Sequence, residues 1–121
     1  MKQTLQAYAE VIPYVTKDGS EIRELMHPAV HGNVAQSLAE ARVFPGQPTL
    51  LHRHRQTEEL YFILEGRGRM TLGDEEFPVV PGDTVCIRPG TPHRIAAEGG
   101  TLRILCCCAP AYSHQDTELI A

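Results

Sequence analysis

The sequence predicts an all-β fold, an antiparallel sandwich or barrel, from the spacing of its apolar runs and from the residues between them. Short runs rich in Val, Ile, Leu, Phe and Tyr recur about every ten residues, the spacing that short strands give. Nine prolines and ten glycines punctuate the 121 residues, as turns between strands require. A chain of this length fits one domain, which we expect to cover residues 1–121.

Turn signals mark the ends of the expected strands. Asp18-Gly19 lies between two β-rich runs and has the composition of a hairpin turn. Three further signals follow along the chain: Gly73-Asp74, Pro81-Gly82-Asp83 and Glu98-Gly99-Gly100. We expect a strand to follow each of them, with the last strand at 102–108.

Only two stretches permit a helix, residues 4–11 and residues 35–41. The second is ambiguous, because its polarity also alternates with the period of a strand. The alternating residues are Leu38, Glu40, Arg42 and Phe44. A strand fits the all-β pattern better than a helix.

Composition excludes several classes of partner. The formal charge is −4 and there is no run of Lys or Arg, so we expect no nucleic-acid partner. No apolar run approaches the roughly 20 residues of a membrane helix, so we expect no membrane partner. The N-terminal stretch lacks the apolar segment of a signal peptide, which predicts a cytoplasmic location.

Four cysteines occur, at Cys86 and at Cys106, Cys107 and Cys108. Neighbouring strand residues point to opposite faces, so the triplet alone cannot form a compact thiolate site, and no C-x-x-C pair exists. In the cytoplasm these residues are expected to be reduced, small and buried. A redox or thiol-ligand role is the alternative.

The most informative residues are the histidines of the central stretch. His52 and His54 are one residue apart in an extended segment, so both imidazoles share a face. A carboxylate follows, and His93 comes about forty residues later, after a Pro-Gly-Thr-Pro turn. These four donor groups could converge on one divalent metal.

These residues follow two sequence motifs of the cupin superfamily, and the chain resembles a small single-domain cupin. Five residues match the first motif: Gly46, His52, His54, Glu59 and Gly66. Three match the second motif: Gly82, Gly90 and His93. Arg88 and Ala97 depart from it, where the family has proline and asparagine. The departures concern loop geometry more than metal ligation.

The resemblance implies a double-stranded β-helix, or jelly-roll, barrel with metal ligation by His52, His54, Glu59 and His93. The two motifs occupy residues 46–66 and 82–97. Residues 1–45 would supply N-terminal strands and a dimer-exchange segment, and residues 109–121 a C-terminal tail. The resemblance also implies a homodimer.

Three imidazole nitrogens and one carboxylate oxygen suit Fe, Mn, Zn, Ni or Cu, so we expect one divalent transition metal of this set. The choice between Glu58 and Glu59 is not settled by periodicity, because both faces of that strand are apolar. The six residues between Glu59 and Gly66 match the motif and favour Glu59.

Other residues are weaker candidates for the pocket. The hydroxyl of Tyr61 could act as donor or acid, although core packing explains this residue equally well. Arg88 could clamp an anionic substrate, or it is a solvent-facing loop residue. The tail with His114 could fold over the barrel mouth, while His27 and His31 are expected to be ordinary polar residues.

The leading hypothesis is a metal-dependent enzyme that acts on a small polar metabolite: a carboxylate, a sugar phosphate or a dioxygenase-type substrate. The reaction could be dioxygenase-like oxidation, decarboxylation or sugar-phosphate isomerisation, because the fold does not fix the reaction. The alternative is a non-catalytic module that binds or senses a small molecule. A metal-free sugar-binding or epimerising barrel is disfavoured by the His-x-His pair.

Overall fold

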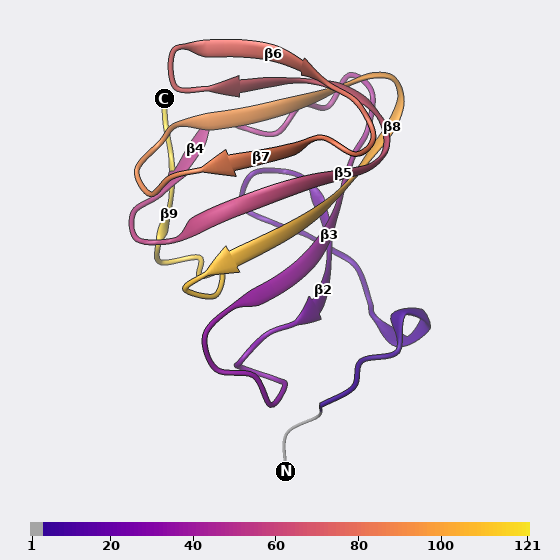
Figure 1. Ribbon diagram of the computed structural model, residues 1–121, viewed down its shortest axis with the longest axis vertical. Helices are drawn as coiled ribbons and strands as arrows, with labels where there is room; N and C mark the ends of the chain where they lie inside the picture. The colour runs from indigo at the N-terminus through magenta and orange to yellow at the C-terminus, as the bar shows by residue number, and fades with distance from the viewer. Residues whose placement is uncertain (1–3) are drawn as a thin grey trace.

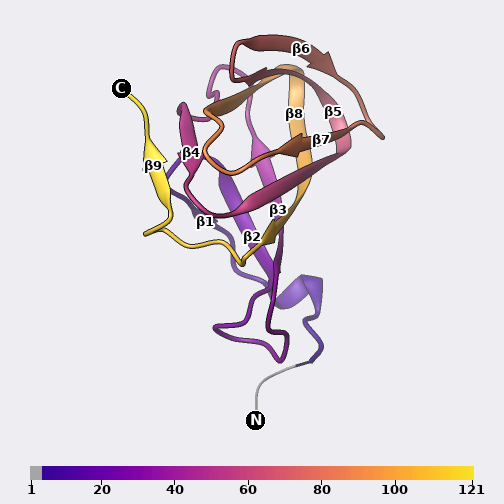
Figure 2. The same ribbon diagram turned by 60° about the vertical axis from the view of Figure 1, so that its left-hand side comes forward.

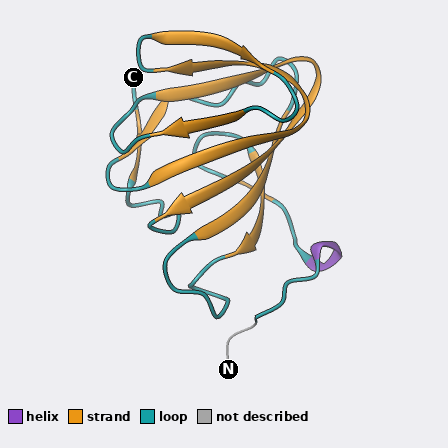
Figure 3. Ribbon diagram, viewed as in Figure 1, coloured by secondary structure: helices purple, strands orange, loops and turns teal. Residues whose placement is uncertain are grey.

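The computed structural model describes residues 4–121, so the first three residues of the expected domain lie outside the described residues. Its strands curl into a barrel-like sheet (Figure 1), and Figure 3 shows how little helix accompanies them. The elements are a 3-10 helix at Tyr8–Glu10 and strands β1 Tyr14–Val15, β2 Glu21–Met26, β3 Ser37–Val43, β4 His52–His54, β5 Glu58–Leu72, β6 Glu75–Val79, β7 Thr84–Ile87, β8 His93–Ala109 and β9 Thr117–Leu119.

Two long strands, β5 and β8, run antiparallel and belong to both walls of the barrel. The C-terminal half of β8 pairs with β3, and its first residue pairs with β4. One wall is therefore β1-β2-β3-β8-β5-β7, and the other is β9-β4-β8-β5-β6. Figure 2 shows the strands wrapping around the interior. This arrangement confirms the predicted all-β jelly-roll barrel.

Glycines allow the two long strands to pass from one wall to the other. Gly66 in β5 and Gly99 in β8 have positive φ angles of 84° and 88°, and the pairing of β5 with β8 is irregular between Ile63 and Arg67. A Cβ on Gly66 would collide with the carbonyl oxygen of Thr101, so a side chain has no room there. The predicted break at 98–100 is therefore wrong: β8 bends at this place and continues.

The other turn signals are confirmed. Asp18-Gly19 joins the paired strands β1 and β2, Gly73 lies in the turn from β5 to β6, and Pro81 to Asp83 precede β7. The ambiguous segment 35–41 enters strand β3, and the possible helix at 4–11 is reduced to one 3-10 turn. Among residues 4–121, no helix has the length and apolarity to cross a membrane.

The core lies between the walls and is built from alternate residues of the long strands. The burial pattern of β5 alternates along most of its length, so one face packs inward. Ile63, Met70, Leu102 and Ile104 are at most 1% exposed. Each such side chain stabilises the fold by about 1.5–3 kcal/mol. Apolar side chains therefore supply most of the stabilisation of the core.

One charged residue, Glu40 on β3, is buried outside this core and ties the N-terminal segment to the sheet. Its Oε1 accepts a 2.7 Å hydrogen bond from the Tyr8 hydroxyl. Its Oε2 accepts bonds of 2.6 and 3.1 Å from the Arg103 guanidinium. Burial alone would raise the pKa of Glu40, but these bonds hold it below its usual value.

We expect Glu40→Gln to lower the free energy of unfolding by about 2 kcal/mol at neutral pH, because it removes the buried charge that Arg103 pairs with. The folded pKa lies below the unfolded value of about 4.3. The contribution is therefore complete above that value and is lost as pH falls through the folded pKa. Urea unfolding at several pH values measures the difference between the two proteins.

The matched control is Glu118→Gln, which breaks a surface pair with Arg53 and should change stability by less than about 0.5 kcal/mol. If Glu40→Gln and Glu118→Gln have equal effects, or if the Glu40→Gln difference persists in strong acid, the role assigned to Glu40 is wrong.

Candidate metal centre

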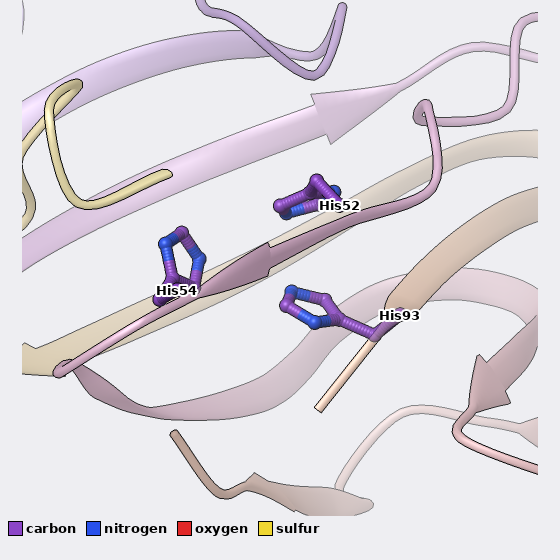
Figure 4. Close-up of side chains that lie close together, drawn as sticks. All are labelled: His52, His54 and His93. Carbon is purple, nitrogen blue, oxygen red and sulfur yellow. The ribbon is translucent and has the colours of Figure 1, made fainter. Parts of the chain in front are cut away.

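Three buried histidines meet where β4 lies beside the start of β8. His52 and His54 flank Arg53 on β4, and their side chains are buried while Arg53 is exposed, as strand alternation requires. His93 is the first residue of β8 and pairs with His52 in register. One ring nitrogen of each histidine lies within 4.8 Å of the other two, and Figure 4 shows the rings gathered together.

Acceptors behind each ring fix its orientation. The Nδ1–H of His52 donates to the Leu50 carbonyl at 2.7 Å, and that of His93 donates to the Thr91 carbonyl at 2.9 Å. The Nδ1 of His54 lies 2.9 Å from Thr117 Oγ1, and this hydroxyl donates its own proton to the Ser113 carbonyl. Thr117 must therefore accept from His54. In all three rings the proton is on Nδ1 and the Nε2 edge faces inward.

Glu59 on β5 supplies the carboxylate of the cluster. It is buried, whereas Glu58 is exposed, so strand alternation aims only Glu59 into the barrel. Its Oε1 lies 3.1 Å from His54 Nε2 and 3.7 Å from His93 Nε2. The structure thus brings together all four residues that the motif resemblance indicates.

This donor set fits a cation. Burial would raise the pKa of Glu59, but the neighbouring imidazoles of His54 and His93 lower it to about 2, so the carboxylate is ionised. Burial and His93 lower the pKa of His52, which favours its neutral form. The Nε2 of His93 is buried and has no hydrogen-bond partner. Lone pairs that face a carboxylate need a proton or a metal ion between them.

Sequence reasoning missed a second carboxylate, Asp18. Its sequence context indicates only a hairpin turn, yet its side chain is buried and its Oδ2 lies 3.5 Å from His52 Nε2. The Asp18 carbonyl accepts a 2.8 Å bond from Leu50 N–H, which holds the hairpin against the segment before β4. The turn composition could predict the hairpin but not this long-range contact.

A cavity opens from the histidines toward the N-terminal strands. Its described lining includes the carboxylates of Asp18, Glu24 and Glu59, the hydroxyls of Tyr14, Tyr61 and Tyr112, and Thr117. Tyr61 is buried and packs edge-on against His93, and burial, then Glu59, raise its pKa well above the usual value. Its hydroxyl is therefore a proton donor rather than a base. Arg88 is exposed and lies outside this lining.

The C-terminal tail closes part of the cavity, but not through His114. Tyr112 and Thr117 line the cavity, whereas His114 is exposed and reaches it only indirectly, through a 3.1 Å contact with the Tyr112 hydroxyl. Lys17 bonds the carbonyls of His114 and Thr117 at 3.1 and 2.7 Å and so fastens the tail to the first hairpin.

The cysteines are only partly as expected. All four are free thiols, and Cys106 and Cys108 are buried in the cavity lining. Cys107 is half-buried and Cys86 is exposed, so the expectation of burial is wrong for these two. The thiol of Cys108 donates to Glu59 Oε2 at 3.4 Å, and burial, followed by the charge of Glu59, raises its pKa. Cys108 therefore stays protonated and helps to orient Glu59.

The two remaining histidines have partners of their own. His31 is buried, accepts a 3.0 Å bond from the His27 backbone N–H, and bonds Gln6 through Nε2 at 2.8 Å. His27 Nε2 donates to the Tyr112 carbonyl at 2.9 Å. Both are structural polar residues outside the cluster of His52, His54 and His93.

Histidine nitrogen chemical shifts test this geometry directly. We expect His52, His54 and His93 each to carry a proton on Nδ1, because each Nδ1 faces an acceptor. Thr117→Val should change the signals of His54 while leaving those of His93 in place. Long-range proton–nitrogen correlation measures which nitrogen carries the proton. If Nδ1 is unprotonated in all three rings, the inward orientation of Nε2 is contradicted.

Comparisons with known proteins agree with this architecture. The family model described as "Cupin domain" matches residues 39–108. The chain is 55% identical to uncharacterized protein MJ1618 of Methanocaldococcus jannaschii, over 99% of this chain and 97% of that protein. It is 30% identical to the oxalate-binding protein of Thermotoga maritima over 67% of each chain.

A solved structure shows the same fold at low sequence identity. The polyketide cyclase RemF from Streptomyces resistomycificus superimposes with a TM-score of 0.81 and 23% identity, covering 100% of this chain and 86% of that one. Together, the matched family model, the relatives and the shared barrel show that the chain belongs to the cupin family.

Proposed function

We propose that this protein binds one divalent transition metal through His52, His54, Glu59 and His93 and acts as a metal-dependent enzyme on a small polar metabolite. The observation that carries the proposal is the gathering of three buried imidazoles, two of which have Nε2 atoms 3.1 and 3.7 Å from the ionised carboxylate of Glu59. The unpartnered Nε2 of His93 supports it, because a buried lone pair without a donor is costly unless a cation satisfies it.

A bound divalent ion would supply Lewis-acid chemistry toward a carbonyl, enediol or carboxylate oxygen. The chain itself supplies the surroundings. Tyr61 keeps its proton and could donate it to a developing oxyanion. Apolar residues of β3 and β8, including Ala41 and Ile104, line the cavity and limit the entry of water. Oxidation with dioxygen, decarboxylation and isomerisation all remain within this chemistry.

The second candidate function is a non-catalytic module in which the metal anchors a small-molecule effector. The relative named as an oxalate-binding protein supports it. Turnover assays across a broad panel of carboxylates, sugar phosphates and dioxygenase substrates, with anaerobically purified protein of known metal content, separate the two. Metal-dependent turnover of any compound in the panel supports the enzyme function. Binding of a compound without turnover supports the non-catalytic module.

We expect His52→Ala and His93→Ala each to lose most bound metal while the barrel still folds, because the core consists of apolar residues. Plasma mass spectrometry of anaerobically purified protein measures the metal, and circular dichroism measures the fold. His114→Ala is the matched control, since His114 is exposed and outside the cluster, and it should keep its metal. Stoichiometric metal in both cluster variants would refute the ligand set.

We further propose a homodimer that forms through the N-terminal segment. Large apolar side chains are exposed along this segment, at Leu5, Ile12, Val15, Val30 and Val34. β1 is also an edge of its sheet, and open edges invite pairing.

The four free thiols accord with the reducing cytoplasm that we propose as the location.

Sedimentation measures the oligomeric state. We expect a dimer at micromolar concentration, because burial of these apolar side chains favours association, and we expect Ile12→Asp with Val15→Asp to dissociate it. Leu119→Asp, on the edge strand at the other end of the sheet, serves as the control. A wild-type monomer under these conditions would remove the claim.

A further inference from the structure

The charges around the cavity are of one sign. Three carboxylates line it: Asp18 and Glu24 from the first hairpin, and Glu59 from β5. Among the described residues that line the cavity there is no lysine or arginine. The nearby Lys17 is turned to the carbonyls of the C-terminal tail. Because exposed carboxylates are common, the important point is that Asp18 is only 9% exposed.

Asp18 is held so that one oxygen remains directed into the cavity. Its Oδ1 accepts bonds from Ser20 N–H at 2.9 Å and from the Ser20 hydroxyl at 2.7 Å. Its Oδ2 lies 3.5 Å from His52 Nε2, beside the three-histidine cluster. The buried Nε2 of His93 has no hydrogen-bond partner and lies 3.7 Å from Oε1 of Glu59, another carboxylate of the lining, so the cluster at this end of the cavity lacks a partner that a ligand could supply.

The effect of these charges is visible on neighbouring groups. Burial raises the pKa of Cys106 well above its usual value, and Glu59, Asp18 and Glu24 each raise it further. Burial and Glu24 raise the pKa of Tyr14 to about 12. Groups on two different strands, β8 and β1, therefore experience the same negative potential.

We propose that this cavity selects an uncharged, hydroxyl-bearing small molecule, whose hydroxyl groups donate to Asp18 and Glu24, and that it discriminates against dianions. The proposal rests on the proposed function and names the substrate class of the same site. Carboxylates accept strong hydrogen bonds from hydroxyl groups. A phosphate or dicarboxylate would instead face these carboxylates without a cationic side chain to offset the repulsion.

A divalent ion held by the cluster would not reverse this preference, because Asp18 and Glu59 would formally balance its two charges and weaken its attraction for a dianion. The remaining wall is apolar and accepts the carbon skeleton of a ligand. Its residues are Ile22, Ala39, Ala41, Val43, Ile95 and Ile104. The ligand class is therefore uncharged, with one hydroxyl-bearing edge and one apolar face.

Oxalate and its neutral isostere oxamide form a matched pair of probes for the charge preference. Calorimetric titration of the purified protein, with its metal content measured, compares their dissociation constants in the wild type and in Asp18→Asn. The amide that replaces the carboxylate in Asp18→Asn retains an oxygen that can accept from Ser20, so the hairpin should persist. We expect wild-type protein to bind oxalate more weakly than oxamide, and Asp18→Asn to bind oxalate about tenfold more tightly than wild type.

Glu24→Gln should shift oxalate binding in the same direction, and Glu76→Gln, an exposed residue of β6 paired with Arg69, should not change it. If wild type binds neither probe and Asp18→Asn gains oxalate binding, the charge selection is supported. Tighter binding of oxalate than of oxamide by wild type overturns the proposal, as does unchanged oxalate binding in both cavity variants.

The metal measurement separates this proposal from the proposed function. Loss of the metal site would appear as wild-type protein without bound metal, and it would leave the effect of Asp18→Asn on oxalate binding measurable. If the wild-type protein holds its metal, but Asp18→Asn and Glu24→Gln bind oxalate and oxamide with the same ratio of affinities as wild type, the substrate class is refuted and the metal site stands.

Discussion

The orientation of three imidazole rings is the constraint on which the site depends. Each ring gives its Nδ1 proton to an acceptor behind it, so each presents Nε2 to the interior. Two of these acceptors are main-chain carbonyls two residues before the histidine, at Leu50 and Thr91. The chain segments that lead into β4 and β8 therefore orient their own histidines. Only His54 depends on a distant partner, Thr117 of β9.

The barrel brings these segments together because its two longest strands serve both walls. β8 pairs with β3 and β4 as well as β5, which places His93 beside His52. Glycines at the bends make this possible, since Gly66 has no space for a side chain against Thr101. The core between the walls consists mainly of apolar side chains. We therefore expect folding not to depend on the four polar groups of the cluster.

The sequence predicted most local features, and its motifs also grouped the distant His93 and Glu59 with the histidine pair. It did not predict the other long-range contacts of the site. Asp18-Gly19 was sufficient for the hairpin, because turn chemistry is local, and the His-x-His spacing placed His52 and His54 on one face. Periodicity could not choose between Glu58 and Glu59, since both faces of β5 carry apolar residues. The role of Asp18 beside His52 depends on packing between segments far apart in the sequence, which no local pattern contains. Thr117 was missed for the same reason.

The central claim is that His52, His54, Glu59 and His93 hold one metal ion. The most direct measurement is a crystal structure of anaerobically purified protein, with anomalous diffraction recorded across the absorption edges of Mn, Fe, Ni, Cu and Zn. We predict one strong anomalous peak among the three Nε2 atoms and Glu59, at coordination distance from each. An anomalous peak elsewhere, or none in protein shown by mass spectrometry to contain stoichiometric metal, would contradict the claim.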